Sequence, residues 1–158
     1  MSNHYVIGID PGITGAIAVA SKTKAAYVLD MPTRTINKKT RLDEHELLRL
    51  VNRFKTLGAT HAYLEKAQAA PGQSAPSMFS YGQTYGALRM TLVAAEVPFT
   101  EVTPLKWKRE LSLAGGRENK RQSLEKARVL YPEMQDYLKR QKDHGRAEAL
   151  LIAHWGAC

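Results

Sequence analysis

Cysteine is almost absent from this chain of 158 residues, in which the only one is Cys158. No disulfide can therefore form within the chain, and nothing indicates an oxidising compartment. Apolar runs are also short, and none approaches the roughly 20 residues that a membrane-spanning helix needs. The N-terminus lacks the basic and apolar segments of a secretion signal. We therefore expect no membrane association and a cytoplasmic location, in a bacterium or in a cell infected by a virus.

Acidic residues are the minority among the charged ones. Lys and Arg number 23 against 15 for Asp and Glu, which gives a formal net charge of +8 at pH 7. Such an excess favours a polyanionic partner such as nucleic acid, although it also fits a protein whose surface is merely cationic. The length predicts one domain, residues 1–158, with a core that needs no disulfide or structural metal.

The first part of the chain predicts an antiparallel meander of three strands. Apolar runs at 4–9, 16–20 and 25–29 are typical of buried strands, and the Gly-containing segment 10–15 is typical of a turn. The polar and basic segment 32–42 has no periodicity, so we expect a loop there.

Helices and strands alternate in the rest of the sequence. Asp43 followed by Glu46 is typical of a helix N-terminus, and two further strands are expected, one ending at Leu64 and one at 99–102. The pattern predicts an α/β fold with a central mixed five-stranded sheet, in which the meander is followed by parallel strands joined by helices. Expected helices are 43–57, 77–95, a short one from 104, 118–130 and one from 143 or 144.

Four acidic residues lie where a predicted strand ends or a predicted helix begins. They are Asp10, Glu65, Asp143 and Glu148. Carboxylates at a buried edge are costly to desolvate, and several together raise one another's pKa unless a cation lies between them. Carboxylates that hold a divalent metal, in a basic chain, predict an enzyme that acts on nucleic acid.

The turn after the first strand reads Asp10-Pro11-Gly12-Ile13-Thr14-Gly15. Its glycines allow a tight turn and the close approach of a phosphate or a metal, and Thr14 offers a hydroxyl. Such a turn occurs in RNase H-like nucleases and also in actin-like ATPases and sugar kinases, where it binds nucleotide phosphate. An ordinary hairpin with an Asp cap is a third interpretation.

Further motifs follow the turn along the chain. They are Tyr63-Leu64-Glu65-Lys66, Phe79-x-x-Gly82-x-x-Tyr85-Gly86, Val102-Thr103-Pro104-Leu105-Lys106-Trp107-Lys108, and the segment 143–153 that contains Asp143 and Glu148. Taken together and in this order, they resemble the RuvC family of Holliday junction resolvases, in particular its bacteriophage and organellar branch. The resemblance covers nearly the whole chain and implies an RNase H-like fold. It also implies a homodimer that nicks two strands of a four-way DNA junction symmetrically, with two Mg²⁺ or Mn²⁺ ions in each active site.

The resemblance also implies a set of metal ligands. Asp10 matches the aspartate that touches both metals, and Glu65 and Glu148 match two further acidic positions of the family. Many members carry an acidic residue or a histidine three positions before the last carboxylate, where this chain has Gly145. Two neighbours are candidates for the fourth place. Helix geometry favours His144, about 40° from Glu148 around the axis, whereas the preference of Mg²⁺ for oxygen favours Asp143.

Basic residues gather near the expected active edge and predict a binding site for phosphates. Lys120 is also expected to act near the scissile bond, because a lysine close to this point contacts that region in relatives. Any single lysine can equally be a solvated surface charge. The residues predicted to contact DNA are Thr14, Phe79, Lys106, Lys108, Arg117, Lys120, Arg121 and Arg146, and further basic residues cluster at Lys38, Lys39, Arg41, Arg109, Lys139, Arg140 and Lys142.

Phe79 has two interpretations: it inserts into the junction centre as an aromatic wedge, or it packs at the start of its helix. Gln68, Met78 and Tyr81 are nearby alternatives for the wedge, and Trp107 is expected to belong to the core.

Gly82 and Gly86 lie four residues apart on one face of a predicted helix, where they permit close packing against the sheet or against a helix of a second subunit. Three rivals to the resolvase remain at this point. They are an actin-like ATPase or kinase, a non-catalytic protein that binds branched DNA, and another RNase H-like nuclease.

Overall fold

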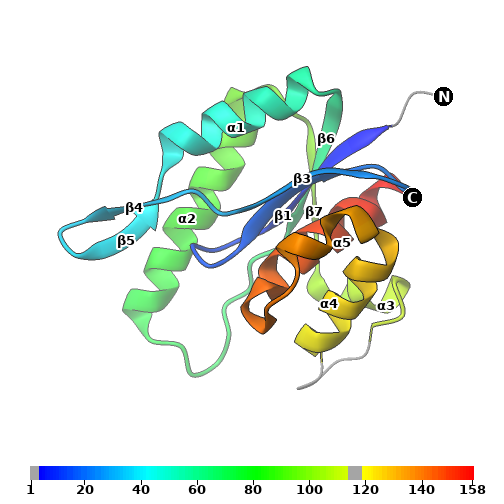
Figure 1. Ribbon diagram of the computed structural model, residues 1–158. Coiled ribbons are helices and arrows are strands. Elements are labelled where there is room, and N and C mark those ends of the chain that lie inside the picture. The colour runs from blue at the N-terminus through cyan, green and yellow to red at the C-terminus, as the bar shows by residue number, and fades with distance from the viewer. Residues whose placement is uncertain (1–3, 114–118) are drawn as a thin grey trace.

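A computed structural model describes residues 4–113 and 119–158 of the chain. Its centre is a sheet of five strands in the order β3-β2-β1-β6-β7 (Figure 1). The meander is antiparallel, and β6 and β7 run parallel to β1 and to each other. The predicted mixed sheet is therefore confirmed. The strands are β1 (Tyr5–Asp10), β2 (Ala16–Ala20), β3 (Ala25–Asp30), β6 (Ala59–Glu65) and β7 (Phe99–Val102).

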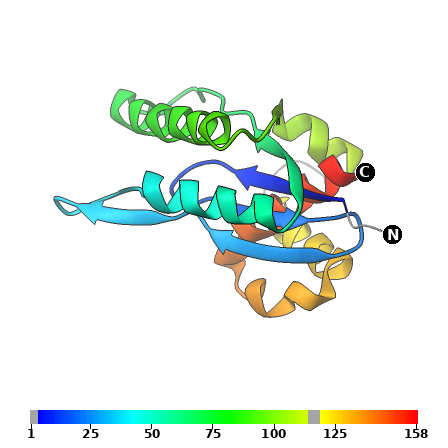
Figure 2. The ribbon, with the colours of Figure 1, turned by 90° about the horizontal axis from the view of Figure 1, so that it is seen from above.

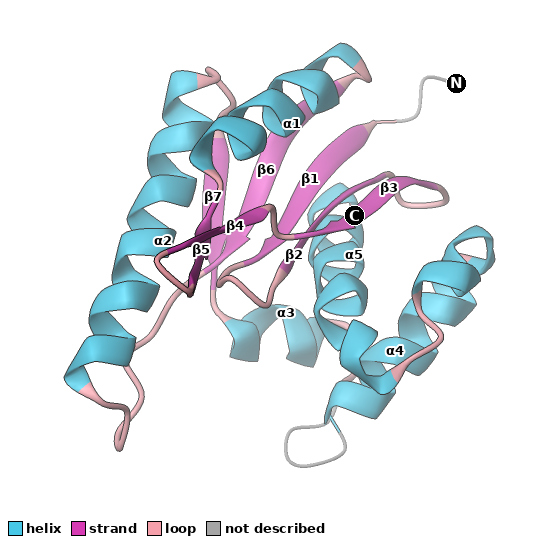
Figure 3. Cartoon of the chain, turned by 60° about the vertical axis from the view of Figure 1, so that its left-hand side comes forward, coloured by secondary structure: helices cyan, strands magenta, loops and turns pink. Residues whose placement is uncertain are grey.

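Helices cover both faces of this sheet (Figures 2 and 3). Helices α1 (Glu44–Thr56) and α2 (Ala75–Ala94) contribute to the core on one face, and α3, α4 and α5 contribute to the core on the other. The expected cap of α1 is confirmed, because Asp43 accepts a hydrogen bond from the Glu46 backbone at 3.0 Å. The second group is α3 (Pro104–Glu110), α4 (Asn119–Leu130) and α5 (His144–Ala157), with 3-10 turns at Pro132–Tyr137 and Gln141–Asp143.

The alternation of side chains along β1 divides the core in two. Ile7 and Ile9 belong to the core under α1 and α2, and Val6 belongs to the core under α5. Because successive side chains of a strand point to opposite faces, Gly8 and Asp10 share the face of Val6. The first strand thus directs Asp10 to the same side of the sheet as α5.

The expected loop at 32–42 is wrong. Strands β4 (Thr33–Ile36) and β5 (Lys39–Leu42) form a separate two-stranded hairpin. Its connection is Asn37 and Lys38, both with positive φ (49° and 61°). Two residues with positive φ form the type of turn that matches the twist of a hairpin. The hairpin extends from the sheet toward α2 (Figure 1).

Among the described residues, no helix has both the length and the apolar character needed to cross a membrane.

Candidate active site

Three of the four predicted carboxylates meet at one edge of the sheet. Asp10, Glu65 and Glu148 each offer an oxygen, and these oxygens lie within 4.8 Å of one another. Asp10 and Glu65 end the adjacent parallel strands β1 and β6, and Glu148 lies in the N-terminal part of α5. Glu148 is buried, and the other two are half-buried. No other group of this kind occurs in the part of the chain that the structure describes.

The close approach of α5 to β1 brings Glu148 to this cluster. A Cβ atom on Gly8 would lie 2.1 Å from the Ala149 carbonyl oxygen and 2.5 Å from the Ala153 nitrogen, so only glycine fits there. The neighbouring strand β2 presents Ala16, Ala18 and Ala20 to the same core. Small residues on this face of the sheet therefore let the helix backbone touch the strand two residues from Asp10.

The turn after β1 is as tight as its glycines predict. Gly15 donates a backbone hydrogen bond to the Gly12 carbonyl at 3.0 Å, and Gly12 has φ 104°. A Cβ on Gly15 would lie 2.0 Å from the Asp10 carbonyl oxygen. The turn folds back on Asp10 and leaves its carboxylate at the end of the strand.

Burial and mutual repulsion perturb the carboxylates. Burial, then Glu148, then Glu65 raise the pKa of Asp10 well above its ordinary value, and the nearby Lys108 opposes this. Burial is also the main cause of the raised pKa of Glu65, which Glu148 raises further. A cation among the three would relieve this repulsion, because opposite charge favours the ionised form.

Two residues of α3 contact the cluster directly. Trp107 is fully buried and donates its indole N–H to Glu65 Oε2 at 2.7 Å. Lys108 places its ammonium 3.1 Å from Glu148 Oε1, with only 17% of its side chain exposed. The same ammonium lies 5.1 Å from the centre of the Trp107 ring. One wall of the site is therefore built from a tryptophan that orients a carboxylate and a lysine that neutralises another.

Asp143 and His144 lie outside the cluster. Asp143 accepts hydrogen bonds from the Arg140 backbone and guanidinium, both at 2.8 Å, and Arg140 holds the pKa of that carboxyl below its usual range. His144 Nδ1 lies 3.3 Å from the Gln141 carbonyl oxygen. A Cβ on Gly145 would lie 3.3 Å from Asp10 Oδ2. The position for which the resemblance implies a ligand thus carries no side chain here, although its backbone borders Asp10.

No family model matches the chain. A sequence relative, the chloroplastic Holliday junction resolvase MOC1 of Chlamydomonas reinhardtii, is 40% identical over 106 residues, which is 63% of this chain and 12% of that protein. RuvC of T. thermophilus, solved in complex with a Holliday junction substrate, superposes with a TM-score of 0.67 at 23% identity, over 98% of this chain and 92% of that one.

The chain has the RuvC fold. A second RuvC structure, from Thermus thermophilus, agrees with a TM-score of 0.57 at 19% identity, over 96% of this chain and 95% of that one. With the sequence match to a resolvase, these likenesses confirm the predicted resemblance to the RuvC-like resolvases and the RNase H-like fold. The chain spans only 12% of the length of the resolvase that it matches in sequence.

The residues predicted to contact DNA lie in different surroundings on this RuvC-like fold. Thr14, Lys106 and Lys120 are exposed, and Arg121 pairs with Glu125 one turn along α4. Arg117 lies outside the described residues. Arg146 is occupied within the fold, because its guanidinium forms two hydrogen bonds to Asp30, at 2.7 and 2.9 Å.

Phe79 is 70% exposed, so the packing interpretation is wrong and its ring is free to meet a ligand. Trp107 belongs to the core as expected, and it also donates a hydrogen bond to Glu65 that no sequence pattern indicates. Tyr81, considered only as a wedge, lies beside the turn after β1, with its ring 3.4 Å from the Cβ that Gly12 would carry. Burial, then Glu65 and Asp10, raise its pKa to about 12. Tyr81 and Trp107 lie inside α2 and α3, and no spacing in the sequence indicates that these helices bring them to the site.

The donor set fits a divalent metal. Asp10, Glu65 and Glu148 supply carboxylate oxygens, the ligands that Mg²⁺ and Mn²⁺ prefer. After burial, repulsion among the carboxylates raises the pKa values of Asp10 and Glu65, and a bound cation would oppose that repulsion. In the protein alone, the Lys108 ammonium supplies part of this positive charge.

Lys108→Met is expected to destabilise the metal-free protein and to increase its response to metal. It leaves Glu148 without its cation, a loss of about 1–3 kcal/mol for a buried group, and a divalent ion can restore the missing charge. Thermal unfolding in EDTA and in millimolar Mg²⁺ would measure both effects. Lys106→Met is the matched control, since the Lys106 ammonium lies over the Trp155 ring at 5.6 Å. An equal Mg²⁺ response in both variants would show that Lys108 does not stand in for a metal.

Proposed function

We propose that this protein is a metal-dependent endonuclease that resolves four-way DNA junctions by paired symmetric nicks. One observation carries the proposal: Asp10, Glu65 and Glu148 converge within 4.8 Å at the edge of a RuvC-like sheet. The sequence match to a protein named as a Holliday junction resolvase supports the same substrate. The resemblance implies products with 5′-phosphate and 3′-hydroxyl ends.

The proposed cofactor is Mg²⁺ or Mn²⁺, with two ions in each site held by Asp10, Glu65 and Glu148. When bound, such ions activate water and stabilise the leaving oxygen of a phosphodiester. Asp143 stays a predicted fourth ligand, and it would have to exchange its bonds to Arg140 for that role. His144 stays the alternative.

In this mechanism, the protein's own groups orient the metal-binding carboxylates and hold the DNA. Trp107 fixes Glu65 through its indole N–H, so that this carboxylate keeps one orientation toward the site. With a metal bound to Glu148, the Lys108 ammonium would be free to bind a phosphate of the DNA strand. Exposed Thr14, Lys106, Lys120 and Arg121, with Arg117, would bind the phosphates further from the cut, with Lys120 near the scissile bond.

Cleavage of a labelled four-way DNA junction beside a linear duplex of the same sequence tests the proposal. Paired symmetric nicks are expected in the junction alone, with Mg²⁺ and not with EDTA. Cutting of both DNAs would favour another RNase H-like nuclease. Tight junction binding with no cutting in Mg²⁺ or Mn²⁺ would favour the non-catalytic DNA-binding protein, which the engagement of Asp143 with Arg140 keeps as the second candidate.

We further propose that residues 1–158 act as one nuclease domain and that two copies associate through α2. An added Cβ at Gly82 or Gly86 would meet nothing within 4 Å in the described chain, so packing against the sheet does not account for these glycines. Met90 and Val93, which are 61% and 56% exposed, continue the same stripe of the helix. A symmetric dimer would use this patch twice and place two sites on one junction.

The double substitution Gly82→Leu and Gly86→Leu is expected to convert a dimer into a monomer, because two large side chains prevent close approach of the helices. The monomer itself should stay folded, since both positions face open space. Sedimentation at micromolar concentration would measure the mass. Asn52→Leu on the exposed side of α1 adds an apolar side chain elsewhere and should leave the mass unchanged. A dimeric double variant would remove α2 as the interface.

A further inference from the structure

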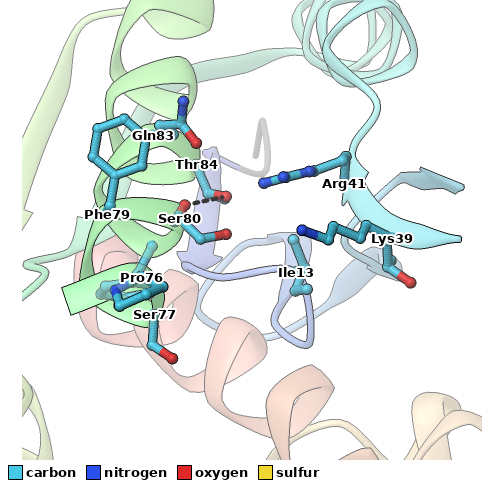
Figure 4. A pocket seen from close by; sticks show the side chains of 11 residues that line it. Ile13, Lys39, Arg41, Pro76, Ser77, Phe79, Ser80, Gln83 and Thr84 are labelled. Carbon is cyan, nitrogen blue, oxygen red and sulfur yellow. Dashed lines mark hydrogen bonds between the residues drawn. The ribbon is translucent and has the colours of Figure 1, made fainter. Parts of the chain in front are cut away.

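Helix α3 supplies two side chains that contact the carboxylate cluster, Trp107 on Glu65 and Lys108 on Glu148. A groove of about 720 Å³ lies elsewhere, between the β4–β5 hairpin and α2, and the cationic side chains of the hairpin point across it toward α2 (Figure 4). No hydrogen bond or ion pair among the described residues joins the lining of this groove to the cluster. The orientation of Glu65 and Glu148 therefore depends on where α3 lies.

Helix α3 is too short to hold its own position. It has seven residues, of which only Trp107 is buried. Isolated helices shorter than about 12–15 residues are marginal in water, so packing against the rest of the protein must fix α3. On one side the Lys126 ammonium of α4 donates to the Leu111 carbonyl, just beyond the end of α3. Helix α4 carries none of the three carboxylates, so this contact does not place α3 relative to them.

A second contact joins α3 to α5, the helix that carries Glu148. The Trp155 indole N–H donates to Glu110 Oε2 at 2.6 Å. Trp155 lies about two turns after Glu148 and about 20° from it around the helix axis, so both residues are on one side of α5. Helix α3 thus touches this side at two points, with Lys108 at Glu148 and Glu110 at Trp155. Two contacts fix the orientation of a short helix that a single contact would leave free to turn.

Trp155 is also anchored on β6, the strand that ends at Glu65. The Tyr63 ring meets the Trp155 ring edge-on, with 5.6 Å between the ring centres. The next residue presses on the same ring, since a Cβ on Gly156 would lie 2.1 Å from Tyr63 Cδ2. Trp155 therefore lies in α5, packs on β6 and bonds α3, which are the elements that carry Glu148, Glu65 and Lys108.

We propose that Glu110 and Trp155 form a clasp that positions α3 for the reaction. The clasp holds α3 in the orientation in which Trp107 bonds Glu65 and Lys108 bonds Glu148. Both residues are positioning residues, because they act through Trp107 and Lys108 and not by contact with metal or DNA. Without the clasp α3 tilts, and Glu65 loses the bond that keeps it turned toward the site. The inference rests on the proposed function, because it concerns the geometry of the nuclease site.

The indole N–H signals of the two tryptophans test the clasp without DNA or metal. In ¹⁵N-correlated NMR spectra recorded in EDTA, Trp155→Phe removes one of the two signals and so assigns the other to Trp107. Glu110→Ala removes the acceptor of Trp155. It is expected to move the Trp107 signal to lower chemical shift, because the hydrogen bond from Trp107 to Glu65 becomes weaker. A loss of stability alone would leave this signal of the folded protein in place.

Two variants serve as controls for Glu110→Ala. Glu110→Gln keeps a side-chain oxygen that accepts the Trp155 N–H, so the Trp107 signal should stay at its wild-type position. Glu46→Ala removes a glutamate of α1 that is paired with Arg49 at 2.8 Å, on the other face of the sheet. It matches the loss of one surface ion pair and should also leave the Trp107 signal unchanged.

Junction cleavage gives the second readout. Glu110→Ala should lower the single-turnover rate at saturating Mg²⁺ by about 10-fold, the lower end of the loss that follows removal of a group that orients a metal ligand. Junction binding in EDTA should stay within a few-fold of wild type, because no contact to phosphate is lost. A double-mutant cycle isolates the bond: once Trp155→Phe has removed the indole N–H, Glu110→Ala should cost nothing further. Additive losses would show that the two residues do not act as a pair and would overturn the clasp.

The outcomes separate the clasp from the proposed function. If the Trp107 signal moves as expected but wild-type protein cuts no junction in Mg²⁺ or Mn²⁺, the clasp stands as the support of α3 and the endonuclease falls. If wild type cuts and Glu110→Ala cuts at the same rate, the clasp has no part in the reaction and the endonuclease stands. Slower cleavage by Glu110→Ala with an unmoved Trp107 signal also overturns the clasp, since the loss then arises elsewhere.

Discussion

Asp10→Asn is expected to abolish junction cleavage and to leave junction binding within a few-fold of wild type. The substitution keeps the shape of the side chain and removes one of three converging carboxylates. Changes to groups that only orient a metal ligand typically cost about 10–100-fold, so loss of a ligand itself should cost more than 100-fold. Rates of single-turnover cleavage in Mg²⁺ and equilibrium binding in EDTA would measure the two effects separately.

The same variant is expected to unfold at a higher temperature than wild type in EDTA. The pKa of Asp10 in the folded protein is raised above its ordinary value of 3.8, so the folded state holds this proton more tightly than the unfolded chain. Stability of the metal-free wild type is therefore lost as pH rises from about 4 through the raised pKa. The neutral amide of the variant carries no such cost. The advantage of the variant should be absent near pH 4 and should grow toward neutral pH.

Asp136→Asn is the control for both readouts, because Asp136 is exposed and its ion-pair partner in the described chain is Lys139. It should cut the junction at the wild-type rate, and any effect on stability should have the opposite sign, since Lys139 lowers the pKa of Asp136. Cleavage by Asp10→Asn near the wild-type rate would remove Asp10 from the catalytic site. Loss of binding together with cleavage would instead give Asp10 a part in holding the DNA.

The sequence was sufficient for the main strands and for the three carboxylates that converge. Buried strands are marked by continuous apolar runs, and parallel neighbours end at the same edge of a sheet. Asp10 and Glu65 could therefore be placed together from their positions after two such runs. Glu148 followed from its place at the start of the apolar helix that covers this face. At this site, the apolar runs in the sequence and the rule that parallel strands end at one edge of a sheet lead to the same placement.

The β4–β5 hairpin could not be predicted in this way, because its strands have only four residues each and almost no apolar side chains. A buried face produces the alternation that marks a strand. On the face toward α2, three of the four positions are cations and the fourth, Ile36, is exposed. The usable signal was local: Asn37 and Lys38 between two short segments rich in threonine. A turn with two positive φ angles is typical of a hairpin even when the strands are polar.

Contacts between distant residues could not be predicted either. Trp107 reaches Glu65 across 42 positions in the sequence, and Lys108 reaches Glu148 from the same short helix. Neither pair has a periodicity that reveals it. The place of Asp143 relative to the cluster depends on where the last helix begins. A 3-10 turn ends at Asp143, and its carboxylate is bonded there to Arg140. Helix boundaries are set by such local bonds, which composition does not show.

Gly8→Ala is expected to damage the fold and the site together. The added Cβ would lie 2.1 Å from the Ala149 carbonyl oxygen, a backbone atom of α5 that cannot move away without the helix. The helix α5 must then shift away from β1. Overpacking of this kind costs about 1–3 kcal/mol and sometimes more, and in a chain of this size each kcal/mol lowers the unfolding temperature by roughly 2–4 °C. We therefore expect a fall of about 6–12 °C, from a loss of about 3 kcal/mol, in differential scanning calorimetry.

Cleavage should fall further than stability alone explains, because Glu148 lies beside Ala149 and moves with it. A displacement of about 1 Å at a catalytic group can cost about 100-fold in rate. Gly82→Ala adds the same methyl group where nothing lies within 4 Å, and at the same dilute concentration it should unfold no earlier than wild type. If Gly8→Ala unfolds at the wild-type temperature and cuts at the wild-type rate, close contact between α5 and β1 is not what positions Glu148. A stable variant with slow cleavage would instead separate the two roles and assign Gly8 to the geometry of the site.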